Sequence, residues 1–156
     1  MVFLISFEMK NVFPNTIENV FFDILLPKCK PFTVGVFYRP PKQAQFIETV
    51  NDDFHKLGVE NKEVYILGDL NINILVNGKY LFDKNKDSLV GSNTFNNLSK
   101  QYKDFCSNFS LTQLIKSPTR ITCNSSTLID HIFTNTPEKV KQCGIINTSI
   151  SDHQLI

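Results

Sequence analysis

Two apolar runs rich in strand-forming residues constrain the fold of this chain more than any other feature of its sequence. They are VFFDILL at Val20–Leu26 and FTVGVFY at Phe32–Tyr38, and only the short PKCKP segment separates them. Val, Ile, Phe and Tyr favour extended backbone, and prolines close both runs. The spacing predicts two neighbouring strands joined by a hairpin connection.

Two longer segments follow a helical pattern instead. Apolar residues recur at helical spacing near Gln43–Leu57 and near Thr94–Phe109. Ser92 or Asn93 is the expected N-cap of the second helix, because their side-chain oxygens accept hydrogen bonds from the first turn. The polar stretch from Asn73 to Gly91 lies between the two patterns and predicts a long loop.

Shorter extended runs complete the pattern. We expect strands at Glu63–Leu67, at Thr127–Phe133 and near Gln154. The order of strand, helix, strand, helix and then several strands predicts an α/β sandwich with a mixed sheet. A chain of 156 residues has the length of one domain or of part of a larger one, and we expect a single domain over residues 1–156.

Composition excludes several classes of protein. Hydrophobic residues make up 42% of the chain, which supports a sizeable core. The formal net charge of +1 excludes a strongly basic nucleic-acid or membrane-surface protein, but not a local basic cleft. The four cysteines form no CxxC pair and have no histidine at zinc-ligand spacing, so we expect buried free thiols. No apolar run reaches the roughly 20 residues that span a bilayer. We expect a soluble intracellular protein, nuclear or cytoplasmic.

Polar side chains stand beside the apolar strands at three places. Asp69 and Asn71 follow one predicted strand and could face the same way, past its carboxyl end. The sequence GDLN is also typical of a turn, because Asp and Asn bond their own backbone. A third place is the SDH sequence at Ser151–His153, which means little by itself. Locally, both the structural and the functional interpretation stay open.

Between these two places, an aspartate lies within the apolar run TLIDHIF. Alternation puts Asp130 on the face of Leu128 and Ile132, and His131 on the opposite face. A carboxylate in such a run needs a hydrogen-bond donor, since burying it unpaired is costly. That donor could serve a structural or a catalytic purpose. His131 is typical of a core or edge histidine, and we expect it to point away from Asp130.

Four motifs in this order resemble the endonuclease/exonuclease/phosphatase family, the DNase I-like superfamily that includes apurinic/apyrimidinic endonucleases. They are YRPP, GDLN, SSTLIDHIF and SDH, which begin at Tyr38, Gly68, Ser125 and Ser151. PTRIT at Pro118, together with SSTLIDHIF and the terminal SDHQLI, is most similar to endonuclease domains of non-LTR (LINE-type) retrotransposons. The likeness runs from about residue 20 to residue 156. It implies a partial four-layer αββα sandwich of the α/β class, with the first strands missing.

The resemblance also implies catalytic roles. Asp69 would orient and deprotonate the attacking water, and Asn71 would hold that water and the phosphate oxygens. His153 would donate to a non-bridging phosphate oxygen, with Asp130 holding its ring, and Tyr38 would contact the phosphate. Phosphodiester hydrolysis needs an activated water and neutralisation of the charge that develops on the phosphoryl oxygens. These residue types can supply both.

The implied cofactor is Mg²⁺ or Mn²⁺, the implied substrate is DNA, and Asp152 would support the metal site. Mg²⁺ prefers oxygen ligands and keeps several waters, so few carboxylates are required. The family's main metal-binding Glu stands on an early strand, however, and Glu8 lies in no matching motif. We therefore expect impaired cleavage. The alternatives are a non-catalytic remnant that binds nucleic acid weakly and a phosphatase of the same superfamily.

Overall fold

A six-stranded mixed sheet forms the centre of the molecule. The computed structural model describes residues 6–10, 18–43, 45–76, 79–82 and 96–156. The strands of the sheet lie in the order β1-β2-β3-β4-β10-β7, and only β3 and β4 are parallel. They are β1 (Ser6–Lys10), β2 (Glu18–Leu25), β3 (Phe32–Tyr38), β4 (Glu63–Asp69), β7 (Thr112–Gln113) and β10 (Asp130–Thr134).

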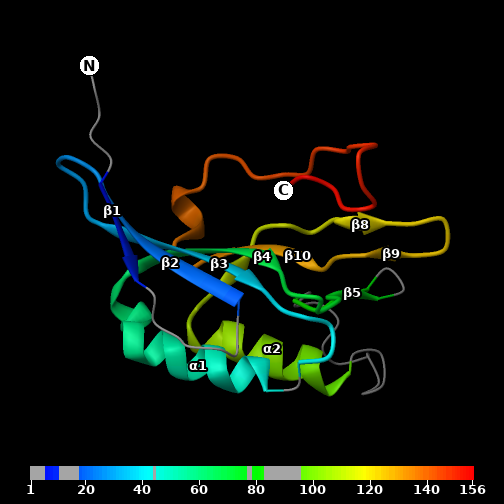
Figure 1. Cartoon of the computed structure of the whole chain (residues 1–156), viewed down its shortest axis with the longest axis horizontal. Helices are drawn as coiled ribbons and strands as arrows, with labels where there is room; N and C mark the ends of the chain where they lie inside the picture. The colour runs from blue at the N-terminus through cyan, green and yellow to red at the C-terminus, as the bar shows by residue number, and fades with distance from the viewer. Residues whose placement is uncertain (1–5, 11–17, 44, 77–78, 83–95) are drawn as a thin grey trace.

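Both α-helices cover one face of this sheet (Figure 1). Helix α1 (Phe46–Leu57) connects the parallel strands β3 and β4, and α2 (Asn97–Asn108) packs beside it. Two small hairpins, β5–β6 and β8–β9, lie outside the main sheet. Their strands are β5 (Leu75–Val76), β6 (Lys79–Tyr80), β8 (Arg120–Ile121) and β9 (Ser126–Thr127). Strand β8 and the C-terminal segment lie on the side away from the helices.

The main core lies between the helices and the sheet. Phe21 and Phe37 contact the ring of Phe54 in α1, each with centroids 6.2 Å apart. Phe54 in turn contacts Phe105 and Phe109 at 5.0 and 5.1 Å. All five rings are buried, and edge-to-face contacts of this kind add to the stabilisation that burial provides. The helical spacing of these residues in α1 and α2 confirms the two predicted amphipathic helices.

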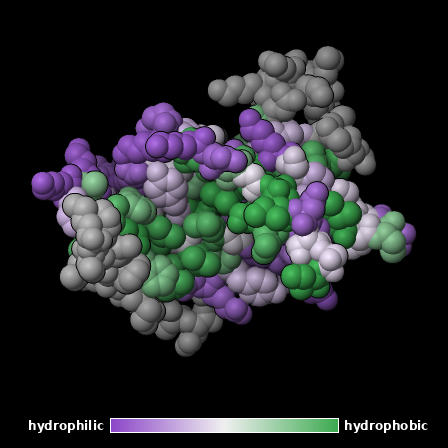
Figure 2. Space-filling view, turned by 90° about the horizontal axis from the view of Figure 1, so that it is seen from above, coloured by the Kyte–Doolittle hydropathy of each residue, from purple (hydrophilic) through white to green (hydrophobic). Residues whose placement is uncertain are grey.

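The opposite face of the sheet is also largely apolar. Val36 is 43% exposed there, and several further hydrophobic side chains on this face are half-buried, among them Val20, Phe22, Val34, Leu67 and Ile132. Figure 2 views the molecule from this side and shows hydrophobic residues gathered in the middle. Apolar side chains on both faces are typical of a sheet in a layered α/β fold. The described residues thus supply one helical layer and one sheet of the expected sandwich.

The structure corrects the predicted strand at Thr127–Phe133. It is broken, because β9 ends at Thr127 and β10 begins at Asp130, and Leu128 and Ile129 between them are both buried. Their carbonyls accept hydrogen bonds from the loop after β4, so tertiary contacts override the alternation. Asp130 shares a face with Ile132, as predicted, but both lie in β10, and Leu128 lies outside this strand. Strand β1 was not expected, and it pairs in antiparallel register along the edge of β2.

Three further expectations change. The predicted loop from Asn73 begins with the β5–β6 hairpin, and Ile74 within it is fully buried. The predicted cap at Ser92 or Asn93 lies outside the described residues, and Asn96 caps α2 by accepting from the Ser99 amide at 2.8 Å. The segment near Gln154 is no strand of the main sheet, since it forms only isolated bridges.

Surface features complete the description of the chain. Cys106 is buried as expected, but the expectation is wrong for the other three cysteines, Cys29, Cys123 and Cys143, which are exposed. None of the helices in the described part of the chain is long and apolar enough to cross a membrane.

Candidate active site

Three of the predicted site residues lie in a row across the end of the sheet. In the strand register, Tyr38 of β3 pairs with Asp69 of β4, and Asp69 pairs with Asp130 of β10. Paired residues project to the same side of a sheet. Their side chains therefore share the face that lies away from the helices. Tyr38 is 40% exposed at the margin of this row.

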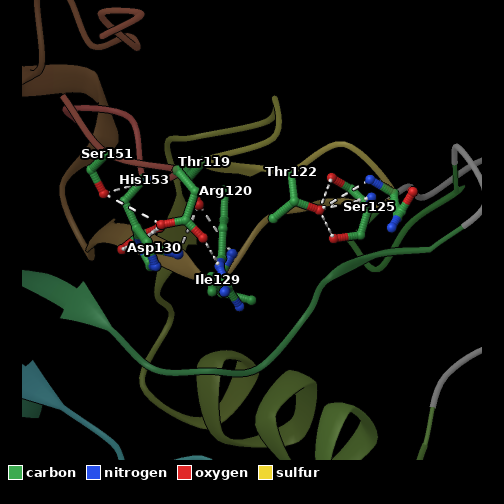
Figure 3. A network of polar contacts seen from close by, with 10 residues as sticks. Thr119, Arg120, Thr122, Ser125, Ile129, Asp130, Ser151 and His153 are labelled. Atoms are coloured by element: carbon green, nitrogen blue, oxygen red, sulfur yellow. Dashed lines mark hydrogen bonds and ion pairs between the residues drawn. The ribbon is translucent and has the colours of Figure 1, made fainter. Parts of the chain in front are cut away.

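His153 approaches this row from the C-terminal segment. Its Nδ1 lies 3.1 Å from both carboxylate oxygens of Asp130 and donates to them (Figure 3). Ligand atoms of Asp69, Asp130 and His153 all lie within 4.8 Å of one another, and the three residues are half-buried. The predicted contact between Asp130 and His153 is thus present, across 23 residues of sequence.

Thr119 connects the segment of His153 to the strand of Asp130. Its side-chain Oγ1 accepts from the backbone amides of Ile129 and Asp130 at 3.1 and 3.0 Å. Its carbonyl accepts from the Gln154 amide at 2.7 Å, and Arg120 forms an antiparallel bridge with His153. Thr119 is fully buried. No role was predicted for Thr119, although it belongs to the PTRIT motif, which could have indicated one.

Asp69 and Asn71 form a turn where β4 ends and the following loop begins. Asp69 Oδ1 accepts from the Asn71 amide at 3.0 Å, and Asn71 adopts a φ of 48°. The side-chain amide of Asn71 donates to the Arg39 carbonyl at 2.9 Å. Gly68 has a φ of 149°, and a Cβ there would lie 1.8 Å from the Phe37 carbonyl oxygen. The turn interpretation of GDLN is therefore correct, and the turn holds both polar side chains at the sheet end.

Arg39 is a second residue for which no role was predicted. It is 2% exposed, and its guanidinium donates to the Gln43 carbonyl at 2.9 Å and the Leu70 carbonyl at 3.3 Å. Its Cζ lies 5.8 Å from the centroid of the Phe46 ring. Burial lowers the pKa of Arg39 from its ordinary value. Arg39 of the YRPP motif thus holds the loop that carries Asn71 through a buried hydrogen bond.

Comparison with known proteins identifies the family. The model of a family described as endonuclease-reverse transcriptase matches residues 32–156, most of the chain. The chain belongs to the endonuclease/exonuclease/phosphatase family. Among curated proteins, none matches this sequence significantly.

Several solved structures share the fold of this chain. The endonuclease domain of TRAS1, a telomere-specific non-LTR retrotransposon, has a TM-score of 0.66 and 16% identity, over 96% of this chain and 64% of that chain. A 3′-5′ exonuclease (NExo) from Neisseria meningitidis has a TM-score of 0.54 and 14% identity, over 96% of this chain and 68% of that one. A beta toxin from Staphylococcus aureus with bound magnesium ions has a TM-score of 0.50 and 15% identity, over 87% and 55%. The chain spans less than two thirds of the first structure's length.

Asp152 lies beside the cluster rather than in it. Its Oδ2 accepts from Arg120 Nε at 2.7 Å, and the two side chains are 42% and 44% exposed. This hydrogen bond lowers the pKa of Asp152 from its ordinary value. Exposed ion pairs of this kind contribute little to stability. The pairing leaves the metal-supporting role of Asp152 as a prediction, because Arg120 already occupies one of its oxygens.

The donor set of the cluster fits a divalent cation. The carboxylates of Asp69 and Asp130 offer oxygen ligands beside the His153 ring, and Mg²⁺ or Mn²⁺ bound through few carboxylates keeps several waters. Burial raises the pKa of Asp69, and the nearby charge of Asp130 adds to that effect, while the Asn71 amide opposes it. A cation would relieve the repulsion between the two carboxylates. In the strand register, Glu8 of β1 pairs with Asp23 of β2.

His131 lies on the other face of β10, as predicted. It is fully buried, and burial lowers its pKa to about 3, so its ring is neutral. The structure therefore separates the two neighbours in IDHIF: Asp130 faces the cluster, and His131 faces the core.

Proposed function

We propose that this chain hydrolyses phosphodiester bonds of DNA with Mg²⁺ or Mn²⁺, as an endonuclease of the retrotransposon type. The observation that carries the proposal is the convergence of Asp69, Asp130 and His153, which come from three separate segments of the chain. The match to a family described as endonuclease-reverse transcriptase and the fold of the TRAS1 endonuclease domain support DNA as the substrate.

Each side chain has a role that its position allows. Asp69 is the base that orients and deprotonates water, and its raised pKa brings it closer to the range in which a carboxylate accepts a proton readily. His153 donates to a non-bridging phosphate oxygen, and Asp130 holds its ring by accepting from Nδ1. This leaves Nε2 of His153 to face the phosphate. Asn71 and Tyr38 contact the phosphate oxygens.

The bound cation would be held by the carboxylates of Asp69 and Asp130, with Asp152 at its margin. A divalent cation supplies charge neutralisation for the phosphoryl oxygens and the leaving oxygen. Within the described residues the cluster contains only these two carboxylates, so we expect weak metal affinity and slow cleavage. The near-neutral net charge further implies weak, salt-sensitive binding of DNA.

A plasmid-nicking assay tests the proposal. The chain is incubated with supercoiled DNA and Mn²⁺ or Mg²⁺, with an EDTA control, and Mn²⁺ binding is measured in parallel. We expect EDTA-sensitive nicking and Mn²⁺ binding, both strongly reduced by Asp69→Ala. DNA binding without any nicking or Mn²⁺ binding would favour the non-catalytic remnant. Hydrolysis of a small phosphomonoester in preference to plasmid would favour the phosphatase.

A further inference from the structure

The loop that carries Asn71 is contacted by His131 from the helical face of the sheet. His131 lies opposite Gly68 in the register of β4 and β10, and its ring projects to the helical face. Its Nε2 lies 3.1 Å from the carbonyl oxygen of Ile72. Because a carbonyl can only accept, Nε2 carries the proton and donates it. The residue after Asn71 is thus hydrogen-bonded to a side chain 59 residues away in the sequence.

Gln113 of β7 fixes the proton on that nitrogen. Its Nε2 lies 2.7 Å from Nδ1 of His131. Its Oε1 accepts from three backbone amides, those of Leu114, Ile115 and Ile132. The amide of Gln113 therefore cannot flip without leaving these N–H groups unpaired in a buried site. Its NH₂ group donates to Nδ1, so His131 is held as the neutral tautomer protonated on Nε2.

Aromatic neighbours hold the ring in place. The Phe133 ring stacks on His131 with centroids 5.5 Å apart and an angle of 9° between planes. Tyr102 of α2 meets it edge-on at 5.4 Å. Packing from two sides leaves the imidazole one orientation, with Nε2 directed at Ile72. The ring thus connects α2, β7 and β10 to the loop after β4.

The Ile72 carbonyl is a sensitive point of this loop. The amides of Leu70 and Ile74, on either side, donate to the Ile129 and Leu128 carbonyls at 3.0 and 3.2 Å. Between these two anchors the backbone passes through Asn71 with its positive φ. A shift of the Ile72 carbonyl would turn the peptide between Ile72 and Asn73 and, through the backbone of Ile72, would displace the neighbouring Asn71.

We propose that His131 is a positioning residue, which with Gln113 fixes the Ile72 carbonyl and thereby the placement of Asn71 and Asp69. The effect on catalysis rests on the proposed function, whereas the effect on the loop does not. Misplacement of a catalytic group by about 1 Å can cost on the order of a hundredfold in rate. The positioning contact comes from the core face, and the residues that it positions lie at the opposite face.

Two substitutions separate the contacts of the ring. In His131→Gln the side-chain amide reaches the position of Nε2 and can donate to Ile72, whereas in His131→Asn the shorter side chain reaches only Gln113. We expect His131→Asn to lower kcat for plasmid nicking about 10- to 100-fold with little change in KM. We expect His131→Gln to lower kcat less, so that the decrease in log kcat is smaller by at least a third than in His131→Asn. The exposed His55 supplies the matched controls His55→Asn and His55→Gln.

NMR of the unmodified protein and of these variants keeps the test independent of activity. The chain has three histidines, and the ¹⁵N shifts of one should report a neutral ring protonated only on Nε2. In His131→Asn the amide signals of residues 69–73 should shift more than in His131→Gln. A His131 ring protonated on Nδ1 would overturn the positioning role. Equal amide shifts in His131→Asn and His131→Gln, with equal rate losses explained by their lowered melting temperatures, would overturn it as well. Absent nicking with the predicted NMR pattern would instead contradict the proposed function alone.

Discussion

Replacing Asp130 by asparagine tests the contact on which the proposed site depends. The substitution keeps the size of the side chain and removes the negative charge that accepts from His153. Both distances to Nδ1 are 3.1 Å, and the Asp130 side chain is only 14% exposed, so water screens the pair incompletely. The backbone amide of Asp130 still donates to Thr119, which should leave the strand in place.

The size of the effect follows from these contacts. A hydrogen bond to a charged group has a net strength of about 1.5–3 kcal/mol, and about 1.4 kcal/mol corresponds to a tenfold change in rate. We therefore expect Asp130→Asn to slow metal-dependent nicking about 10- to 150-fold. The melting temperature should stay within a few degrees of the original. Asp52→Asn, at an exposed position of α1, removes the same charge far from the cluster and should leave the rate unchanged.

A double substitution shows whether Asp130 acts through His153. Rates of nicking are measured for Asp130→Asn, for His153→Ala and for both together. If Asp130 holds the imidazole, its loss should matter little once the imidazole is absent, so the effects should not add. Full additivity would refute action through His153 and would leave Asp130 with its role toward the cation alone. A rate for Asp130→Asn within twofold of the original protein would refute both roles.

Three further substitutions test the frame of the site. Asp53 is buried in α1, and burial raises its pKa from 3.8 to about 6. Its ionisation therefore destabilises the fold as the pH rises from about 4 to about 6. Asp53→Asn should remove this pH dependence of the unfolding free energy, measured by denaturant titration, and should stabilise the protein at pH 7 by on the order of 3 kcal/mol at most. Gly68→Ala would bring a Cβ against the Phe37 carbonyl and should abolish the cooperative melting transition or lower its midpoint by more than about 10 °C. Thr119→Val leaves two buried amides without an acceptor and should cost about 2–4 kcal/mol in unfolding free energy, and an unchanged value would show that other groups accept these amides.

Several elements followed from local pattern. The two helices and strands β2, β3 and β4 have strong apolar periodicity, and the structure places them within a few residues of the predicted ranges. Weakly patterned elements did not follow. The break at Leu128 and Ile129 is one case, because two consecutive apolar residues are both buried by contacts with the loop after β4. Alternation predicts faces only where a strand is continuous.

The candidate site divides in the same way. The sequence by itself marked Tyr38, Asp69, Asn71, Asp130 and the SDH segment, because their motifs and order resemble one family. Local sequence also explains the Asp69 turn, since an aspartate accepts from an amide two residues later. Both kinds of feature can be predicted from sequence, because the turn joins near neighbours in the chain and the motifs are shared by a whole family.

Only the tertiary structure decided which of these side chains meet and what holds them. His153 reaches Asp130 across 23 residues, Thr119 joins their two segments, and Asp152 turns to Arg120 instead of joining the cluster. Buried His131 likewise contacts the Ile72 carbonyl across 59 residues. Such partners cannot be predicted from local pattern, because a buried polar group needs some hydrogen-bond partner, while packing of distant segments determines which partner is within reach.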